Sequence, residues 1–242
     1  MEEKRIFHAV LFLKSTANIQ NRIFLSATHH VRFKLYQLMH IAIVGNIGAG
    51  KTTLTQMLGE YYKWEVMYEA VEGNPYLADF YQDMGRWAFN LQIFFLNSRF
   101  AQVQKIRATT YSTIIQDRTI YEDAYIFARN LHESGVMTDR DYQTYQLLFD
   151  SIIRSVSQPD LLIYLKADIP KLVSQIKKRG RDFEAEISLE YLSALNNYYN
   201  DFVASYDHGK IIEIDVNEMD FAANPDDFQS IITRLNKELF YV

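Results

Sequence analysis

A glycine-rich loop carries the clearest chemical signal in this sequence. Residues 45–52, GNIGAGKT, match the pattern G-x-x-x-x-G-K-[ST] and lie between an apolar β-branched run and a helix-like run. In such a strand–loop–helix unit the backbone N–H groups surround a polyphosphate, with Lys51 on the outer phosphates and the Thr52 hydroxyl on Mg²⁺. The motif predicts a nucleoside triphosphate site formed by Gly45, Asn46, Ile47, Gly48, Ala49, Gly50, Lys51, Thr52 and Thr53.

Charged residues after two further predicted strands indicate what receives the phosphoryl group. Glu69 follows the second predicted strand, and Asp117-Arg118-Thr119 follows the third. Parallel strands of an α/β sheet present such side chains to the ligand at their carboxyl ends. A carboxylate there can act as general base on a neutral hydroxyl, and an arginine can neutralise the transferred phosphoryl group. The pattern favours phosphorylation of an alcohol, with Glu69, Arg118 and Lys51 as catalytic residues.

The elements that must position these residues alternate between strands and helices. Apolar runs buried on both faces are typical of a parallel sheet covered by helices, so we expect one doubly wound α/β domain. Strands are predicted at residues 41–44, 113–116, 161–165 and 211–216, with a weaker fifth at 65–68. Helices are predicted near residues 52–62, 76–105, 122–133, 139–156, 169–177, 189–206 and 226–240.

Composition excludes several classes of protein. The net charge is −5 and no Lys/Arg cluster is dense enough to follow a phosphate backbone, so we expect no nucleic-acid partner. No stretch approaches the ~20 apolar residues that span a bilayer, which predicts no membrane association. The chain has no cysteine, which is consistent with a reducing compartment and with a cytoplasmic location.

The first 38 residues differ from the rest in charge. They hold six Lys and Arg against two Glu, a net charge of +4, whereas the remaining residues hold 19 basic and 28 acidic side chains, a net charge of −9. We predict a domain at residues 39–242, and we interpret residues 1–38 as a disordered or non-native extension. A targeting segment or an additional folded element are the alternatives.

Five sequence blocks lie in the order and spacing of one enzyme family. They are GNIGAGKTT at 45–53, EAVEGNP at 69–75, WAFNLQIFFLNSR at 87–99, DRTIYEDAY at 117–125, and RGR at 179–181 followed by LEYL at 189–192. From about residue 39 to 221 the chain resembles the deoxyribonucleoside kinases, in the branch that includes bacterial deoxyadenosine and deoxyguanosine kinases. The resemblance implies a P-loop kinase with a five-stranded parallel sheet and a short arginine-rich lid. It also implies ATP as phosphoryl donor, Mg²⁺, the 5′-hydroxyl of a deoxynucleoside as acceptor, and a homodimer.

The resemblance also assigns roles to residues around the reacting atoms. Glu69 resembles the general base on the 5′-hydroxyl, Arg118 the arginine beside the reacting oxygen, and Asp117 an acidic residue that helps to hold Mg²⁺. Thr119 replaces the usual serine and keeps its hydroxyl. Ala124 stands where some animal members have another arginine, so details of base recognition do not transfer.

Substrate binding is assigned in the same way. Gln92 and Arg99 are seven residues apart and share one face of a predicted helix, which allows both to reach one pocket. The resemblance implies that they read the base edge together with Asp123, while Tyr81 and Glu184 hold the 3′-hydroxyl. Arg179 and Arg181 match lid arginines that close on the phosphates of ATP. Helices with apolar faces near 76–105 and 142–156 are the expected dimer surfaces.

Two other functions share part of this pattern. A thymidylate-kinase-like nucleoside monophosphate kinase has the same fold and an Asp-Arg motif, although Glu69 argues against it. A P-loop ATPase switch would hydrolyse ATP without an acceptor. Among deoxynucleosides we expect deoxyadenosine to be preferred and deoxyguanosine to be second, with deoxycytidine and thymidine open.

Overall fold

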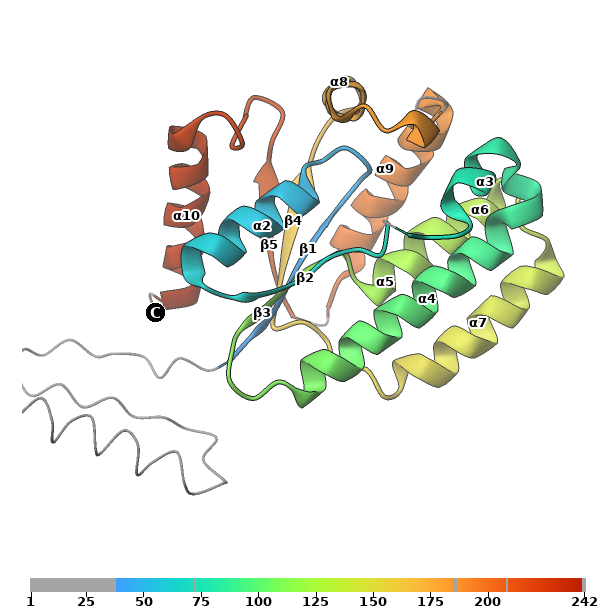
Figure 1. Cartoon of the computed structure of the whole chain (residues 1–242), viewed down its shortest axis with the longest axis horizontal. Coiled ribbons are helices and arrows are strands. Elements are labelled where there is room, and N and C mark those ends of the chain that lie inside the picture. The colour runs from blue at the N-terminus through green and yellow to red at the C-terminus, as the bar shows by residue number, and fades with distance from the viewer. Residues whose placement is uncertain (1–37, 72, 185–186, 208, 241–242) are drawn as a thin grey trace, which may run out of the picture. The chain divides into compact units, whose positions relative to one another are not determined.

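Five parallel strands form the centre of the protein. The computed structural model describes residues 38–240 except 72, 185–186 and 208. The strand order is β2-β3-β1-β4-β5 (Figure 1). The bounds are β1 (His40–Gly45), β2 (Glu65–Met67), β3 (Ile114–Asp117), β4 (Leu161–Lys166) and β5 (Lys210–Asp215). The predicted α/β fold with a five-stranded parallel sheet is therefore confirmed.

The register brings the ends of the central strands together. Ile43 of β1 pairs with Asp117 of β3 and with Ile163 of β4. The phosphate loop follows β1 and the Asp117-Arg118-Thr119 turn follows β3, so both begin at the same edge of the sheet. This edge is where an α/β sheet binds its ligands.

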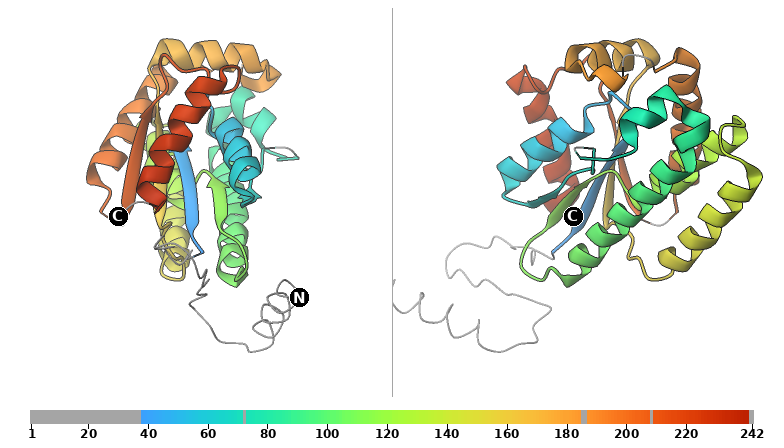
Figure 2. Two further views of the ribbon diagram at one scale, coloured as in Figure 1. Left: turned by 90° about the vertical axis from the view of Figure 1, so that its left-hand side faces the viewer. Right: turned by 45° about the vertical axis from the view of Figure 1, so that its right-hand side comes forward.

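Helices cover both faces of the sheet. One apolar core joins the sheet to α2 and α10, and a second joins it to α4, α7 and α9 (Figure 1, Figure 2). The α-helices are α2 (Lys51–Tyr62), α3 (Leu77–Gln82), α4 (Met84–Ala108), α5 (Ile120–Glu122), α6 (Arg129–Glu133), α7 (Asp139–Ile153), α8 (Ile169–Arg179), α9 (Leu189–Ser205) and α10 (Pro225–Phe240). A π-helical segment, η1 (Asp123–Ala128), lies between α5 and α6, and a 3₁₀ turn, η2 (Asp182–Glu184), follows α8.

Two predicted helices are interrupted. The helix expected at 76–105 breaks at Asp83, whose backbone is non-helical (φ −145°, ψ 82°) and whose side chain accepts a hydrogen bond from the Arg86 N–H at 3.0 Å. Asp83 thus ends α3 and caps α4. The helix expected at 122–133 contains the π-helical segment η1, a feature that is common at functional sites and that side-chain periodicity does not predict.

Backbone pairing of the domain is present from Met39 onward. The Met39 carbonyl accepts from the Ile114 N–H at 2.9 Å, and the Met39 N–H donates to Thr113 Oγ1 at 3.2 Å. The predicted extension at residues 1–38 lies, apart from Leu38, outside the described part of the chain. None of the helices described is both long and apolar enough to cross a bilayer.

Candidate active site

The loop between β1 and α2 has a backbone that only glycine permits at two positions. Gly48 has φ 85° and Gly50 has φ 93°. A Cβ on Gly48 would lie 2.7 Å from the Leu172 carbonyl oxygen, and one on Gly50 would lie 2.8 Å from the Phe221 ring. Glycine at these two positions therefore lets the loop pack against α8 and Phe221 in a left-handed backbone, which leaves its N–H groups able to approach an anion at the start of α2.

A cavity of about 420 Å³ opens over this loop. Its walls come from the loop, the segment after β2, α4, the turn after β3, α8 and the segment after β5. The predicted site residues that line it are Ile47, Gly48, Ala49, Gly50, Lys51, Thr52, Thr53, Glu69, Tyr81, Gln92, Arg118, Asp123, Arg179, Arg181 and Glu184. This cavity thus brings together predicted site residues that are up to 137 positions apart in the sequence (Ile47 to Glu184).

The first two loop residues, Gly45 and Asn46, are not among the residues that line the cavity. Asn46 Nδ2 donates to the Leu192 carbonyl at 3.0 Å and to Asn196 Oδ1 at 2.7 Å. Its side chain therefore fastens the loop to α9. Because Gly45 has no side chain and the Asn46 side chain bonds to α9, these two residues could contact a nucleotide only through their backbone.

Lys51 lies at the floor of the cavity. Its side chain is buried and Nζ donates to the Asn46 carbonyl at 2.9 Å. Burial, and secondly the positive charge of Arg118, lower the pKa of Lys51 to about 8. An anion bound over the loop would stabilise the charged form, so the lysine is placed to respond to a polyphosphate.

Thr52 and Asp117 form an oxygen-rich pair beside the lysine. Thr52 Oγ1 donates to Asp117 Oδ2 at 2.5 Å, while Asp117 Oδ1 is buried and has no hydrogen-bond partner among the described residues. Burial, and secondly the charge of Glu69, raise the pKa of Asp117. Hydroxyl and carboxylate oxygens are the ligands Mg²⁺ takes, and a cation would satisfy the orphaned Oδ1. These two residues fit the predicted Mg²⁺ site.

Glu69 lies two residues beyond β2 and faces two guanidinium groups. Its Oε1 accepts from Arg99 Nη2 at 3.0 Å and lies 3.2 Å from Arg118 Nε. Burial acts to raise the pKa of Glu69, but the charges of Arg118 and Arg99 outweigh it and the pKa is lowered. The side chain is therefore a carboxylate at neutral pH, able to accept a proton.

Arg118 is held in a strained backbone conformation. Its φ of 68° is in the left-handed region, which costs a non-glycine residue on the order of 1–3 kcal/mol. Its N–H donates to the Ile43 carbonyl at 2.9 Å, and its guanidinium lies 4.2 Å from the centre of the Phe127 ring. The left-handed turn directs the guanidinium into the cavity beside Glu69.

Arg99 connects the reacting groups to the far end of the cavity. Nη1 donates to the Asp117 carbonyl at 3.0 Å, and Nε lies 3.4 Å from Asp123 Oδ2. Arg99 itself is not among the residues that line the cavity, whereas Gln92 and Asp123 are. Gln92 Oε1 is buried without a partner among the described residues, so it is open to a ligand donor. Of the three predicted base-reading residues, two reach the cavity and Arg99 lies behind them.

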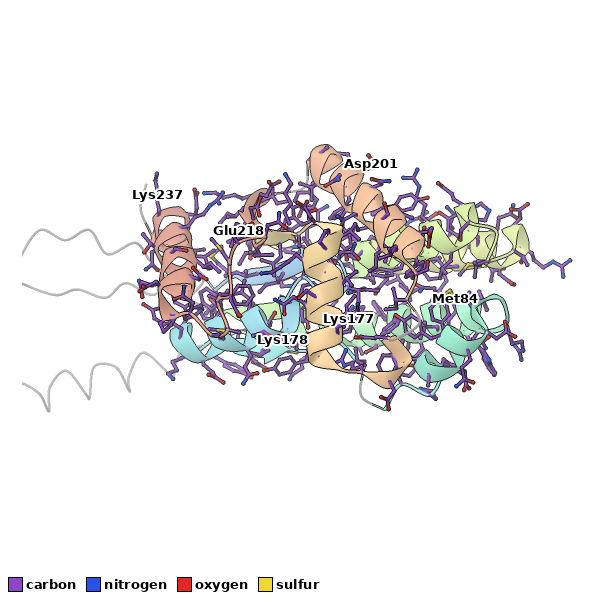
Figure 3. The ribbon with its side chains drawn as sticks, turned by 90° about the horizontal axis from the view of Figure 1, so that it is seen from above. Met84, Lys177, Lys178, Asp201, Glu218 and Lys237 are labelled. Atoms are coloured by element: carbon purple, nitrogen blue, oxygen red, sulfur yellow. The ribbon has the colours of Figure 1, made fainter. Side chains whose placement is uncertain are left out.

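The predicted lid and sugar residues form an ion-pair cluster at the rim. Glu184 is buried and accepts from Arg179 Nε at 2.9 Å and from Arg181 Nη1 at 3.3 Å. Tyr81 stacks on Phe183, with ring centres 5.8 Å apart. Arg179 ends α8, the helix that crosses this end of the sheet and has Lys177 and Lys178 on its last turn (Figure 3).

Sequence reasoning missed Glu122 and two aromatic residues of the cavity wall, Phe127 and Phe221. Glu122 is fully buried and caps α5 through Thr119 in a reciprocal capping box. The T-x-x-E spacing at 119–122 is the signal that could have identified this cap. Phe127 and Phe221 reach the site only because of the π-helical segment and the β5–α10 connection, neither of which has a residue pattern of its own.

Asp123 should make stability depend on pH. Burial raises the pKa of Asp123 to about 7, against ~3.9 in an unfolded chain. Between these values the folded protein keeps a proton that the unfolded chain has lost, so this contribution to stability is present at low pH and is lost as pH rises through 7. From pH 5 to pH 8, Asp123→Asn should gain on the order of 2–3 kcal/mol in unfolding free energy relative to wild type.

Denaturant unfolding of both proteins at the two pH values measures this difference. Asn197→Ser, on the exposed surface of α9, is the control, because it changes no titratable group and should show a constant offset. An equally constant offset for Asp123→Asn would contradict the raised pKa.

Comparison with known proteins identifies one enzyme family. The profile of the family described as deoxynucleoside kinase matches residues 41–240. A deoxyadenosine kinase of Dictyostelium discoideum is 46% identical over 178 residues, which cover 74% of this chain and 72% of that protein. A deoxyadenosine/deoxycytidine kinase of Bacillus subtilis (strain 168) is 33% identical over 197 residues, which cover 81% and 90%.

A solved structure is similar as well. The deoxyadenosine kinase from M. mycoides, with the products dCMP and dCDP bound, has a TM-score of 0.73 and 32% identity, and the match covers 82% of this chain and 100% of that one. The resemblance drawn from the sequence blocks is confirmed, and the chain belongs to the deoxynucleoside kinase family.

Proposed function

We propose that this kinase transfers the γ-phosphoryl group of ATP to the 5′-hydroxyl of a deoxyribonucleoside, with deoxyadenosine preferred and deoxyguanosine second. The observation that carries the proposal is the single cavity that holds Lys51 and Thr52 at one wall and Gln92 and Asp123 at another, with Glu69 and Arg118 also in its wall. A donor at the loop and a nucleoside at the far wall would meet at Glu69.

The residues around Glu69 support a direct transfer. The carboxylate accepts the proton of the attacking hydroxyl, since it is ionised at neutral pH. Arg118 contacts the same carboxylate and stabilises the negative charge of the transferring group. Mg²⁺ held by Thr52 and Asp117 would neutralise charge on the phosphates of ATP. Arg179 and Arg181 would add positive charge from the rim.

The base preference rests on Gln92 and Asp123. A glutamine amide offers both a donor and an acceptor, and a site of buried polar groups rejects bases that leave a partner unpaired. A deoxyadenosine kinase at 46% identity and a deoxyguanosine kinase of Lactobacillus johnsonii at 34% identity both match this chain, which supports a purine deoxynucleoside as substrate.

A panel of four deoxynucleosides with ATP and Mg²⁺ tests the preference. We expect the highest kcat/KM for deoxyadenosine and the next for deoxyguanosine. A higher kcat/KM for thymidine or deoxycytidine would contradict the order.

We also propose a homodimer formed through α4 and α7. Leu147 on α7 is 71% exposed and Leu148 is 41% exposed, which gives this helix an apolar surface. Light scattering should then report twice the chain mass of 28.4 kDa. The monomer mass would contradict the proposal.

The cytoplasmic location of the protein stays a prediction.

A chain that starts at Met39 should keep full activity. Every predicted site residue lies between Gly45 and Glu184, and the Met39 carbonyl still accepts from the Ile114 N–H of β3. We therefore expect the same kcat and KM for deoxyadenosine, measured beside the full chain. Loss of cooperative unfolding or of turnover would show that residues 1–38 belong to the functional domain.

A further inference from the structure

A buried carboxylate outside the cavity joins its two reacting halves. Glu122 is 0% exposed and is not among the cavity residues. Its Oε1 accepts from the Tyr199 hydroxyl at 2.8 Å and from the Gly45 N–H at 3.4 Å. Its Oε2 accepts from the Thr119 N–H at 2.7 Å and from Thr119 Oγ1 at 3.3 Å.

The segments that Glu122 joins carry different parts of the site. Gly45 is the first residue of the phosphate loop that ends in Lys51 and Thr52. Thr119 directly follows Arg118, the residue with the left-handed backbone. Gly45 and Glu122 are 77 positions apart, so this contact is set by the tertiary fold alone.

The Glu122 carboxylate fixes two backbone segments that are not fixed by their own conformation. A glycine at the end of a strand and a strained turn are both free to shift unless their polar groups are fixed, and a strained conformation persists only where its surroundings determine it. Buried N–H groups that lose their acceptor are destabilised. One carboxylate that accepts from both segments fixes the distance between them.

We propose that Glu122 is a positioning residue, which holds the phosphate loop and the Arg118 turn at the separation that phosphoryl transfer requires. This inference rests on the proposed function and extends it to a residue that touches neither substrate. Positioning acts on the reacting geometry, so its loss should reduce kcat and leave nucleoside binding intact. Gln92 lies on α4, and Asp123, which follows Glu122 in the chain, keeps its ion pair with Arg99 of α4.

Glu122→Gln separates the two contacts. The amide oxygen can still accept from the Thr119 N–H, while the amide N–H₂ faces the Tyr199 hydroxyl, which can accept from it. The Gly45 N–H then loses its acceptor. We expect kcat for deoxyadenosine to fall ~10–10²-fold, the scale of a misplacement of about 1 Å, with KM within about 2-fold of wild type.

Tyr199→Phe is the matched control, since it removes one hydrogen bond to the same carboxylate oxygen and leaves the Gly45 contact in place. Its kcat should stay within about 3-fold of wild type, because the positioning contact remains. Glu122→Asp keeps the charge but is one methylene too short to reach both segments. It should show the same fall in kcat as Glu122→Gln.

Hydrogen exchange of the Gly45 amide gives a readout that needs no turnover. Exchange should be at least ~10-fold faster in Glu122→Gln than in wild type and unchanged in Tyr199→Phe. Full kcat in either Glu122 variant, unchanged Gly45 exchange, or an equal loss of kcat in Tyr199→Phe would overturn the proposal. If the proposed function itself is wrong, the wild-type protein will phosphorylate no deoxynucleoside, which distinguishes that failure from a failure of the positioning proposal.

Discussion

Replacing Lys51 with alanine should reduce kcat by at least ~10³-fold, the loss expected when a preorganised charge on the transition state is removed. Lys51 is buried at the floor of the cavity, and its ammonium group contacts the loop carbonyl of Asn46. No other lysine among the described residues lies in that loop. Steady-state kinetics with ATP and deoxyadenosine measures the loss.

Lys105→Ala is the control for this variant. Lys105 is exposed on α4 and pairs with Glu65, away from the cavity. Its kcat should equal that of wild type. A folded Lys51→Ala protein with near-normal turnover would rule out the loop as the phosphate site.

Glu69→Gln should lower kcat ~10²–10⁴-fold, which is the usual contribution of a positioned general base. Both guanidinium groups contact the same oxygen, Oε1, so the amide oxygen of glutamine can occupy that place. The volume and these contacts persist while the proton acceptor is lost. The KM for deoxyadenosine should change little, because Glu69 is needed for the reaction more than for binding.

Glu65→Gln provides the matched control, since Glu65 lies on β2 near Glu69 and its carboxylate pairs with Lys105 outside the cavity. Equal kcat in wild type and Glu65→Gln is expected. If Glu69→Gln instead raised KM and left kcat unchanged, Glu69 would be a binding residue and the base mechanism would be wrong.

The sequence was sufficient to predict the sheet, and most of the site residues that it indicated lie around one cavity. Apolar runs such as 41–44 and 161–165 are buried on both faces. Such continuous apolar runs are a direct consequence of a parallel sheet that is covered by helices on both sides. The loop motif was equally predictive, because its glycines are required by the close approach of Leu172 and Phe221. Side chains that follow strands could be assigned to the same edge from topology alone.

Other features could not be predicted because they depend on tertiary contacts. The left-handed backbone of Arg118 has no residue signature, since arginine is not a residue that favours this region. The break at Asp83 is a local cap inside an otherwise helical pattern. Helical spacing also could not predict that Arg99 lies behind Gln92 and Asp123, because spacing places residues on one helix face without giving their depth.

The central claim is that the γ-phosphoryl group of ATP moves to a 5′-hydroxyl, and one labelling measurement tests it directly. The protein is incubated with γ-labelled ATP and Mg²⁺ and with deoxyadenosine, with 2′,5′-dideoxyadenosine, with dTMP, or with no acceptor. We predict labelled dAMP from deoxyadenosine and no labelled nucleotide from the analogue that lacks the 5′-hydroxyl. Labelled dTDP from dTMP, or labelled phosphate released equally with and without an acceptor, would contradict the account.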